Sequence, residues 1–102
     1  MIFVQGVIKV ASESLDDIIS PVIEIAKASD KEVGCLHYSF AQDISDPSIF
    51  HICERWRSED DLNAHFQEPH VATFNAAIAG LKIESMDVRM YSGDEVRIMM
   101  QS

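Results

Sequence analysis

The alternation of apolar and polar residues predicts four strands. Residues 2–10 are β-branched or apolar at both odd and even positions, which predicts a strand covered on both faces. Residues 35–42 and 49–57 predict two further strands, joined by a turn over 43–48 where Asp, Ser and Pro favour a reversal of the chain. Residues 82–91 predict a fourth strand, whose methionines and valine share one face.

Two helical segments separate these strands, and the first begins with an N-cap signal. Ser14 is followed by Asp17 in the spacing of a capping pattern, and apolar residues then recur at helical spacing. Pro21 lies inside this segment and predicts a kink or a restart of the helix, and Gly34 closes the helical region. The residues of the apolar stripe are Leu15, Ile18, Ile19, Val22, Ile23 and Ala26.

The second helical segment carries a similar signal. Ser58 with Asp61 predicts an N-cap, and the apolar residues that follow again have helical spacing. Pro69 interrupts this segment and predicts two separate helical pieces, and Gly80 ends the second piece.

The element order is therefore β-α-β-β-α-β. With short, right-handed connections this order predicts an α+β fold of the ferredoxin-like type, an antiparallel sheet with both helices on one face. The first strand is apolar on both faces but the helices cover only one, so the other face predicts a homodimer of two sheets packed face to face. We expect one domain over residues 1–92, and a tail over 93–102 whose apolar residues pair with the partner subunit.

Composition and charge narrow the classes of partner. The chain has 17 acidic and 8 basic side chains, a formal net charge of −9, which disfavours nucleic acid. The chain has no apolar run of about 20 residues, so no membrane segment is expected, and no secretory signal is visible, so the expected location is the cytoplasm. Cys35 and Cys53 lie in different strands, and we expect buried, reduced thiols.

The predicted hairpin places groups with acid–base chemistry side by side. If its turn centres near Ser45, facing residues sum to about 91, which sets His37 opposite Glu54 and Cys35 opposite Trp56. A carboxylate beside an imidazole makes a pair that can be tuned near neutral pH. The alternative is a satisfied polar pair at the sheet surface.

The histidines of the second helical segment are further candidates. His65 and His70 are five residues apart, which on a continuous helix turns their rings about 140° from each other. No nearby Cys or Asp completes a ligand set, so we expect no metal site. His65 is a candidate acid, base or donor facing a pocket, and His70 is a candidate helix cap or core-edge residue.

No phosphate-binding glycine loop, nucleophile elbow or dinucleotide fingerprint is present, so no cofactor is expected. Trp56 is most simply a core residue, and it is also a candidate wall for an aromatic substrate.

One family shares this arrangement of residues. The pattern is Gly34-Cys35-x-x-Tyr38, Phe50-x-x-x-Glu54-x-Trp56, Ser58, and His65-x-x-x-Pro69-His70 with Phe74. It resembles the antibiotic biosynthesis monooxygenase superfamily over residues 2–91. The resemblance implies a dimeric α+β barrel with a pocket between sheet and helices. It also implies oxidation of quinols or polycyclic aromatic substrates by molecular oxygen, without metal, flavin or heme.

Two branches of that superfamily fit less well. The heme-degrading branch has an Asn on the first strand, a Trp in the second helix and a His ten residues later. Here the first strand has no Asn, His65 stands at the Trp position, and Asn75 stands at the later His position. A branch that processes a phosphorylated autoinducer would need cations near the pocket, for which Arg55, Arg57 and Arg89 are the candidates.

The resemblance leads to a functional hypothesis, a cofactor-independent monooxygenase acting on a quinol or small aromatic substrate. His65 or His37 would be the base and Glu54 would orient the imidazole. The candidate substrate contacts are Trp56, Phe74, His70 and Tyr38. Two alternatives stay open: an isomerase or epimerase of a small carbonyl metabolite, which could be phosphorylated, and a dimeric binding module without enzymatic activity.

Overall fold

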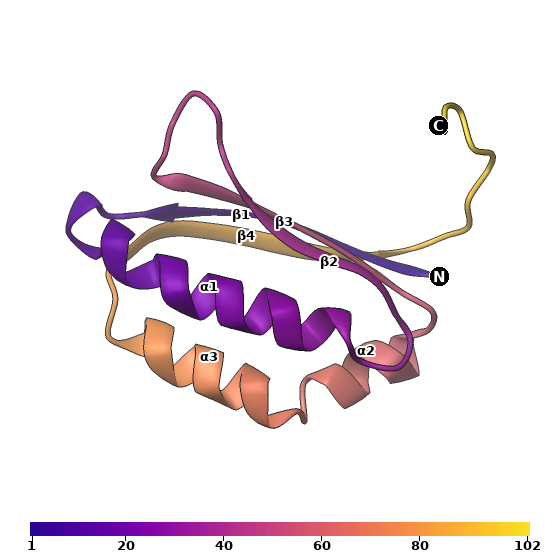
Figure 1. The fold of residues 1–102 in the computed structure, drawn as a ribbon, viewed down its shortest axis with the longest axis horizontal. Coiled ribbons are helices and arrows are strands. Elements are labelled where there is room, and N and C mark those ends of the chain that lie inside the picture. The colour runs from indigo at the N-terminus through magenta and orange to yellow at the C-terminus, as the bar shows by residue number, and fades with distance from the viewer.

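The computed structural model describes residues 1–102 and confirms the predicted element order and α+β fold (Figure 1). The four strands form one antiparallel sheet in the order β2-β3-β1-β4, the ferredoxin-like arrangement. The elements are β1 (Ile2–Val10), a 3₁₀ turn (Ser12–Ser14), α1 (Leu15–Asp30), β2 (Cys35–Gln42), β3 (Ile49–Trp56), α2 (Glu59–His65), α3 (Pro69–Ala79) and β4 (Ile83–Ser92).

The helices form one layer against one face of the sheet, and the core lies between the two layers (Figure 1). Alternate residues of β1 and β3 point toward the helices, and the buried stripe of α1 packs against them. Burial of each such side chain stabilises the fold by about 1.5–3 kcal/mol. The strand and α1 residues of this core include Ile2, Val4, Ile8, Val10, Phe50, Ile52, Ile18, Val22 and Ile25.

The first helix differs from expectation in two respects. Ser14 precedes α1 but makes no side-chain cap; its Oγ instead accepts a hydrogen bond from the backbone N–H of Lys82 at 2.9 Å. This bond ties the start of α1 to the entry of β4. The helix also continues through Pro21 without a restart, since Ile18 and Val22 on either side of it are buried and their packing offsets the lost backbone hydrogen bond.

The turn between α1 and β2 depends on Gly34. Its φ of 85° lies in the left-handed region that favours glycine. A Cβ at this position would lie 2.3 Å from Cγ of Asp61, so glycine is also needed for the close approach of the chain to α2.

The second helical segment has the predicted caps and break. Ser58 Oγ accepts a hydrogen bond from the Asp61 N–H at 3.2 Å, and the Asp61 carboxylate binds the Arg57 guanidinium at 2.9 and 3.0 Å. Helix α2 ends at His65, and α3 begins anew with Pro69 at its first turn. This break changes the direction in which the following residues point.

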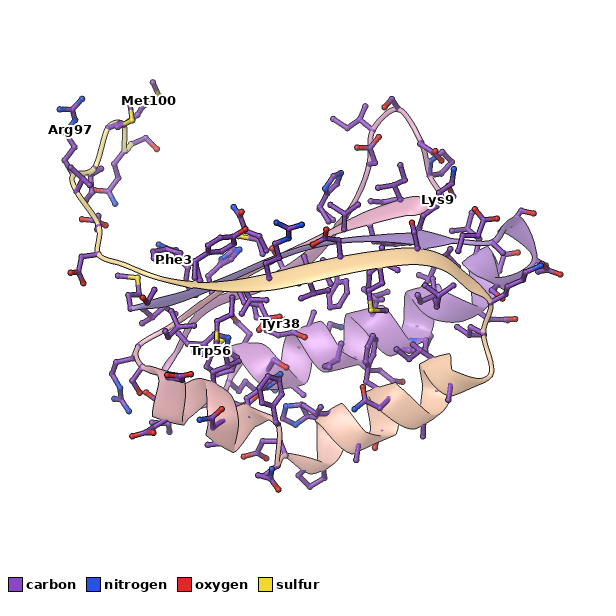
Figure 2. The ribbon with its side chains drawn as sticks, turned by 180° about the vertical axis from the view of Figure 1, so that it is seen from behind. Phe3, Lys9, Tyr38, Trp56, Arg97 and Met100 are labelled. Atoms are coloured by element: carbon purple, nitrogen blue, oxygen red, sulfur yellow. The ribbon has the colours of Figure 1, made fainter.

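The face of the sheet away from the helices is open. Figure 2 shows Phe3 and Lys9 pointing away from the helices, and Tyr38 and Trp56 pointing toward them. The tail that carries Arg97 and Met100 extends away from the body of the domain, with its apolar side chains exposed (Figure 2). Its pairing with a partner stays a prediction. None of the helices is both long enough and apolar enough to cross a membrane.

Candidate functional site

A mainly apolar cavity of about 360 Å³ lies between the sheet and the helices. All four strands and all three helices contribute to its wall. Its polar and titratable groups are few: Tyr38, Glu54, His65 and Asn75. An apolar cavity of this size with a few convergent polar groups is typical of a small-molecule site.

The pairing of β2 with β3 corrects one prediction about this site. Cys35 does lie opposite Trp56, as expected, but the register shifts between Cys35 and His37. From the turn as far as His37 the facing residues sum to 92, one more than predicted, so His37 faces Arg55 and Tyr38 faces Glu54. Because a shift of one residue moves a side chain to the other face of a sheet, His37 lies on the open face and not in the cavity.

Neither of the two free cysteines lines the cavity. Cys53 is exposed, so burial of both thiols was wrong, and Cys35 is partly buried. Burial, with the nearby charges of Asp30 and Glu32, raises the pKa of the Cys35 thiol to about 11. That thiol is therefore protonated at neutral pH and a poor nucleophile.

Glu54, in the cavity wall, and Trp56, behind that wall, form a buried pair. The indole N–H of Trp56 donates to Glu54 Oε1 at 2.9 Å. Burial raises the pKa of Glu54, while the Trp56 hydrogen bond and the charge of His65 oppose that rise. Trp56 is fully buried and is not part of the cavity wall. It therefore holds Glu54 in place as a core residue and does not itself line the cavity.

Tyr38 is the aromatic residue next to Glu54 in the wall. Its ring lies 6.0 Å from that of Phe40 and 5.6 Å from that of His65, measured between centroids. Burial, followed by the charge of Glu54, raises the pKa of the Tyr38 hydroxyl. The hydroxyl therefore stays protonated at neutral pH, with the buried Ser29 of α1 as its nearest hydrogen-bonding neighbour.

His65 is held by a residue that the sequence did not point to. The His65 ring lies 4.8 Å from the Trp56 ring, and its Nδ1 lies 2.5 Å from Oε2 of Glu32. Glu54, expected to orient this imidazole, instead bonds Trp56. Glu32 lies in the turn after α1, 33 residues from His65 in the chain, and no local pattern links the two.

His70 bonds the same carboxylate from the other side. Its Nε2 lies 2.8 Å from Oε2 of Glu32, so one oxygen joins both imidazoles. His70 does not line the cavity of about 360 Å³. It borders another cavity, of about 100 Å³, between α1 and α3. The argument against a metal site rested on the angle between the rings on a continuous helix and on the lack of a nearby Cys or Asp. The break before Pro69 brings the two rings together, and Glu32 adds a carboxylate between them. Ligand atoms of Glu32, His65 and His70 all lie within 4.8 Å of one another.

No arginine or lysine lines the cavity between the sheet and the helices. Arg57 bonds Asp61, and Arg89 bonds Asp87. Arg55 lies opposite Phe3 on the open face of the sheet. The cavity therefore lacks the cation that a phosphorylated substrate would need.

Comparison with known proteins places this arrangement in a family. The family model described as antibiotic biosynthesis monooxygenase matches residues 1–77. The chain belongs to this family. Among its relatives, an uncharacterised protein from Synechocystis sp. is 29% identical over 98 residues, which are 96% of this chain and 67% of the relative.

Solved structures of similar proteins agree with the assignment. A candidate antibiotic biosynthesis monooxygenase from Deinococcus radiodurans is 26% identical, with a TM-score of 0.88 over 99% of this chain and 100% of that one. A protein of unknown function from Bacteroides thetaiotaomicron, described as a possible oxidoreductase, is 27% identical, with a TM-score of 0.79 over 88% and 94%. The family assignment thus rests on sequence and fold together.

Proposed function

We propose that this antibiotic biosynthesis monooxygenase family member oxidises a quinol or small aromatic substrate with molecular oxygen and no cofactor. The observation that supports this most directly is the position of His65. Its buried imidazole lies in the wall of an apolar cavity, and its Nδ1 is held by Glu32. A ring-shaped, mainly apolar substrate suits a cavity that lacks cations.

The Glu32 carboxylate determines which nitrogen of the neutral His65 ring carries the proton. When the Nδ1–H donates to Glu32 Oε2, the lone pair is on Nε2, which makes no hydrogen bond within the chain. Nε2 can then accept the proton of a ring hydroxyl. A carboxylate that orients an imidazole in this way also stabilises the imidazolium that forms.

The reaction follows from that proton transfer. The deprotonated ring is electron-rich and reacts with oxygen; one oxygen atom enters the ring and the other leaves as water, so the quinol becomes a hydroxylated quinone. The Tyr38 hydroxyl, kept protonated by its raised pKa, donates a hydrogen bond to the oxyanion. Phe40 and Phe74, with ring centroids 5.9 Å apart, supply an apolar surface for the ring and exclude water.

Oxygen uptake with a menadiol-like quinol tests the proposal. Replacing the base in His65→Ala should lower the rate by about 10²-fold or more, the contribution of a general base. His37→Ala removes the histidine on the open face and should keep the wild-type rate. Wild-type uptake no faster than autoxidation of the quinol, or a larger loss in His37→Ala than in His65→Ala, would overturn the proposal.

We also propose that the protein works as a homodimer packed through the open face of the sheet. This face exposes Val7 and Tyr91, large apolar side chains that a second sheet would cover. The exposed apolar tail over 93–102 would extend the contact. The mass in solution, measured by light scattering, decides between one subunit and two.

A further inference from the structure

We propose that Glu32, His65 and His70 form a site for a divalent transition-metal ion of the zinc class, and that the bound ion prevents His65 from acting as a base. The second half of this statement rests on the proposed function; the first half does not.

The donor set is the first support. Two imidazole nitrogens and one carboxylate oxygen are the ligands that zinc and its neighbours prefer, and three protein ligands leave further positions for water. They come from three parts of the chain: Glu32 from the turn after α1, His65 from the end of α2 and His70 from the start of α3. The ligand atoms already lie within 4.8 Å of one another.

The distances show how an ion would enter. Glu32 Oε2 lies 2.5 Å from His65 Nδ1 and 2.8 Å from His70 Nε2, which are hydrogen-bond distances. A tetrahedral ion about 2.0–2.1 Å from each ligand atom needs those atoms about 3.3 Å apart. Glu32 Oε2 therefore has to retreat by less than about 1 Å. The two ring nitrogens, which lie within 4.8 Å of each other, have to approach by up to about 1.5 Å to reach that separation. Side-chain rotations of the three residues provide both movements.

Access and burial are the second support. The side chains of His65 and Glu32 are 4% and 10% exposed, whereas that of His70 is 23% exposed. His70 also borders the cavity of about 100 Å³ whose wall includes Glu24 and Thr73. This cavity gives the ion a route from solvent, and its oxygen atoms can hold the waters that complete the coordination. A net charge of −9 favours the approach of a cation.

The effect on His65 follows from the chemistry of imidazole. A neutral imidazole carries one proton, so a metal ion on Nδ1 moves that proton to Nε2. The nitrogen that would accept the substrate proton is then already protonated. Metal binding and base catalysis therefore exclude each other on this residue.

The binding half is tested with Zn²⁺ and Co²⁺ alone on the full chain after treatment with chelator. Titration calorimetry should give one site per chain, Co²⁺ should produce the visible absorption of a site with nitrogen ligands, and Trp56 fluorescence should change with the same midpoint. His70→Ala, and Glu32→Gln as a variant of nearly unchanged shape, should weaken Zn²⁺ binding by at least about 10–100-fold, the loss expected even for a residue that only supports a ligand.

A matched control separates this site from surface binding. His51 pairs with Asp43 at 2.8 Å on the exposed hairpin, so His51→Ala removes an ordinary histidine–carboxylate pair. Its affinity for Zn²⁺ at the cluster should equal that of the wild type. The binding proposal is overturned if no stoichiometric binding occurs, or if binding persists in both cluster variants and is lost in His51→Ala.

The regulatory half is tested by measuring the rate of oxygen uptake with and without saturating Zn²⁺. In the wild type Zn²⁺ should lower this rate by about 10²-fold, the contribution of a general base, and chelator should restore it. Zinc binding without any quinol oxidation by the metal-free protein would support the metal site and refute the proposed function. Quinol oxidation without zinc binding would support the proposed function and refute the metal site. Zinc binding that leaves the rate of quinol oxidation unchanged would refute the proposal that the ion prevents His65 from acting as a base.

Discussion

Removal of the Glu32 carboxylate tests the site most directly through the stability of the metal-free protein. Glu32→Ala leaves the Nδ1–H of His65, whose side chain is 4% exposed, without an acceptor, at a cost of about 1–3 kcal/mol. The His70 side chain is 23% exposed, so water can replace its partner, and we expect a loss below about 1 kcal/mol. Together these terms predict a decrease of about 1–4 kcal/mol in the free energy of unfolding, or about 5–20 °C in Tm.

Double-mutant cycles separate the contribution of the Glu32–His65 interaction from that of the Glu32–His70 interaction. The coupling energy of Glu32 with His65 should be about 1.5–3 kcal/mol, the value for a hydrogen bond to a charged group, and larger than that of Glu32 with His70. Urea unfolding with chelator present, at fixed protein concentration, gives each value. Trp56 is the only tryptophan and lies beside the cluster, so its fluorescence reports the site itself, while far-UV circular dichroism reports the whole fold.

The exposed pair of Asp43 and His51 is the control for this cycle. It joins the same two kinds of side chain at 2.8 Å, but water competes for both partners, so its coupling should be much smaller. A Glu32–His65 coupling below about 0.5 kcal/mol, or no larger than the control, would show that the carboxylate does not hold the imidazole and would refute the reasoning behind both proposals.

Three further predictions concern the turn, the buried carboxyl group and the open face. Gly34→Ala should lower the free energy of unfolding in urea by about 2–4 kcal/mol, because the left-handed φ and the contact with Asp61 both oppose a Cβ. Gly80→Ala, with nothing within 4 Å of the added Cβ, should change it little, and equal losses in the two variants would contradict this account. Burial raises the folded-state pKa of Glu54, so ionisation of this carboxyl group opposes folding. The wild type and Glu54→Gln should therefore be similarly stable near pH 4. Once the pH exceeds the folded-state pKa, the variant should be more stable than the wild type by about 1.4 kcal/mol for each unit of the pKa shift. An advantage for the variant at low pH only would reverse the sign of the argument. Val7→Glu should halve the mass measured by light scattering while preserving the fold of each subunit, and an unchanged dimer would place the interface elsewhere.

The sequence predicted the order of elements because their signals are local. Ser58 capped the helix as expected, Pro69 split the helical segment, and the two-sided apolar pattern of residues 2–10 marked the central strand. These signals depend on neighbours within a few residues, and the family pattern adds residues spaced along the same elements. The pairing of Cys35 with Trp56 was also correct, but only because the register shifts between Cys35 and His37; the pairs nearer the turn sum to 92 and not to 91.

The sequence also singled out His65, His37 and Glu54 as candidates for the site, but the structure does not place Glu54 against either imidazole. The turn sets a register that sums to 92 and not to 91, which moves His37 to the opposite face, and an irregularity beyond His37 restores the predicted pair of Cys35 and Trp56. Hairpin counting detects neither. Glu54 therefore bonds Trp56, and His65 bonds Glu32. The identities of the reactive groups are visible in the sequence, whereas their partners are not.

By itself, then, the sequence determined the elements, their order and the residues able to do chemistry, because propensity, capping and periodicity act over short distances. Only the tertiary structure decided that Glu32 meets His65 and His70. That contact needs α1 to lie against α3 and the chain to break before Pro69, so its geometry is set by packing between segments more than 30 residues apart.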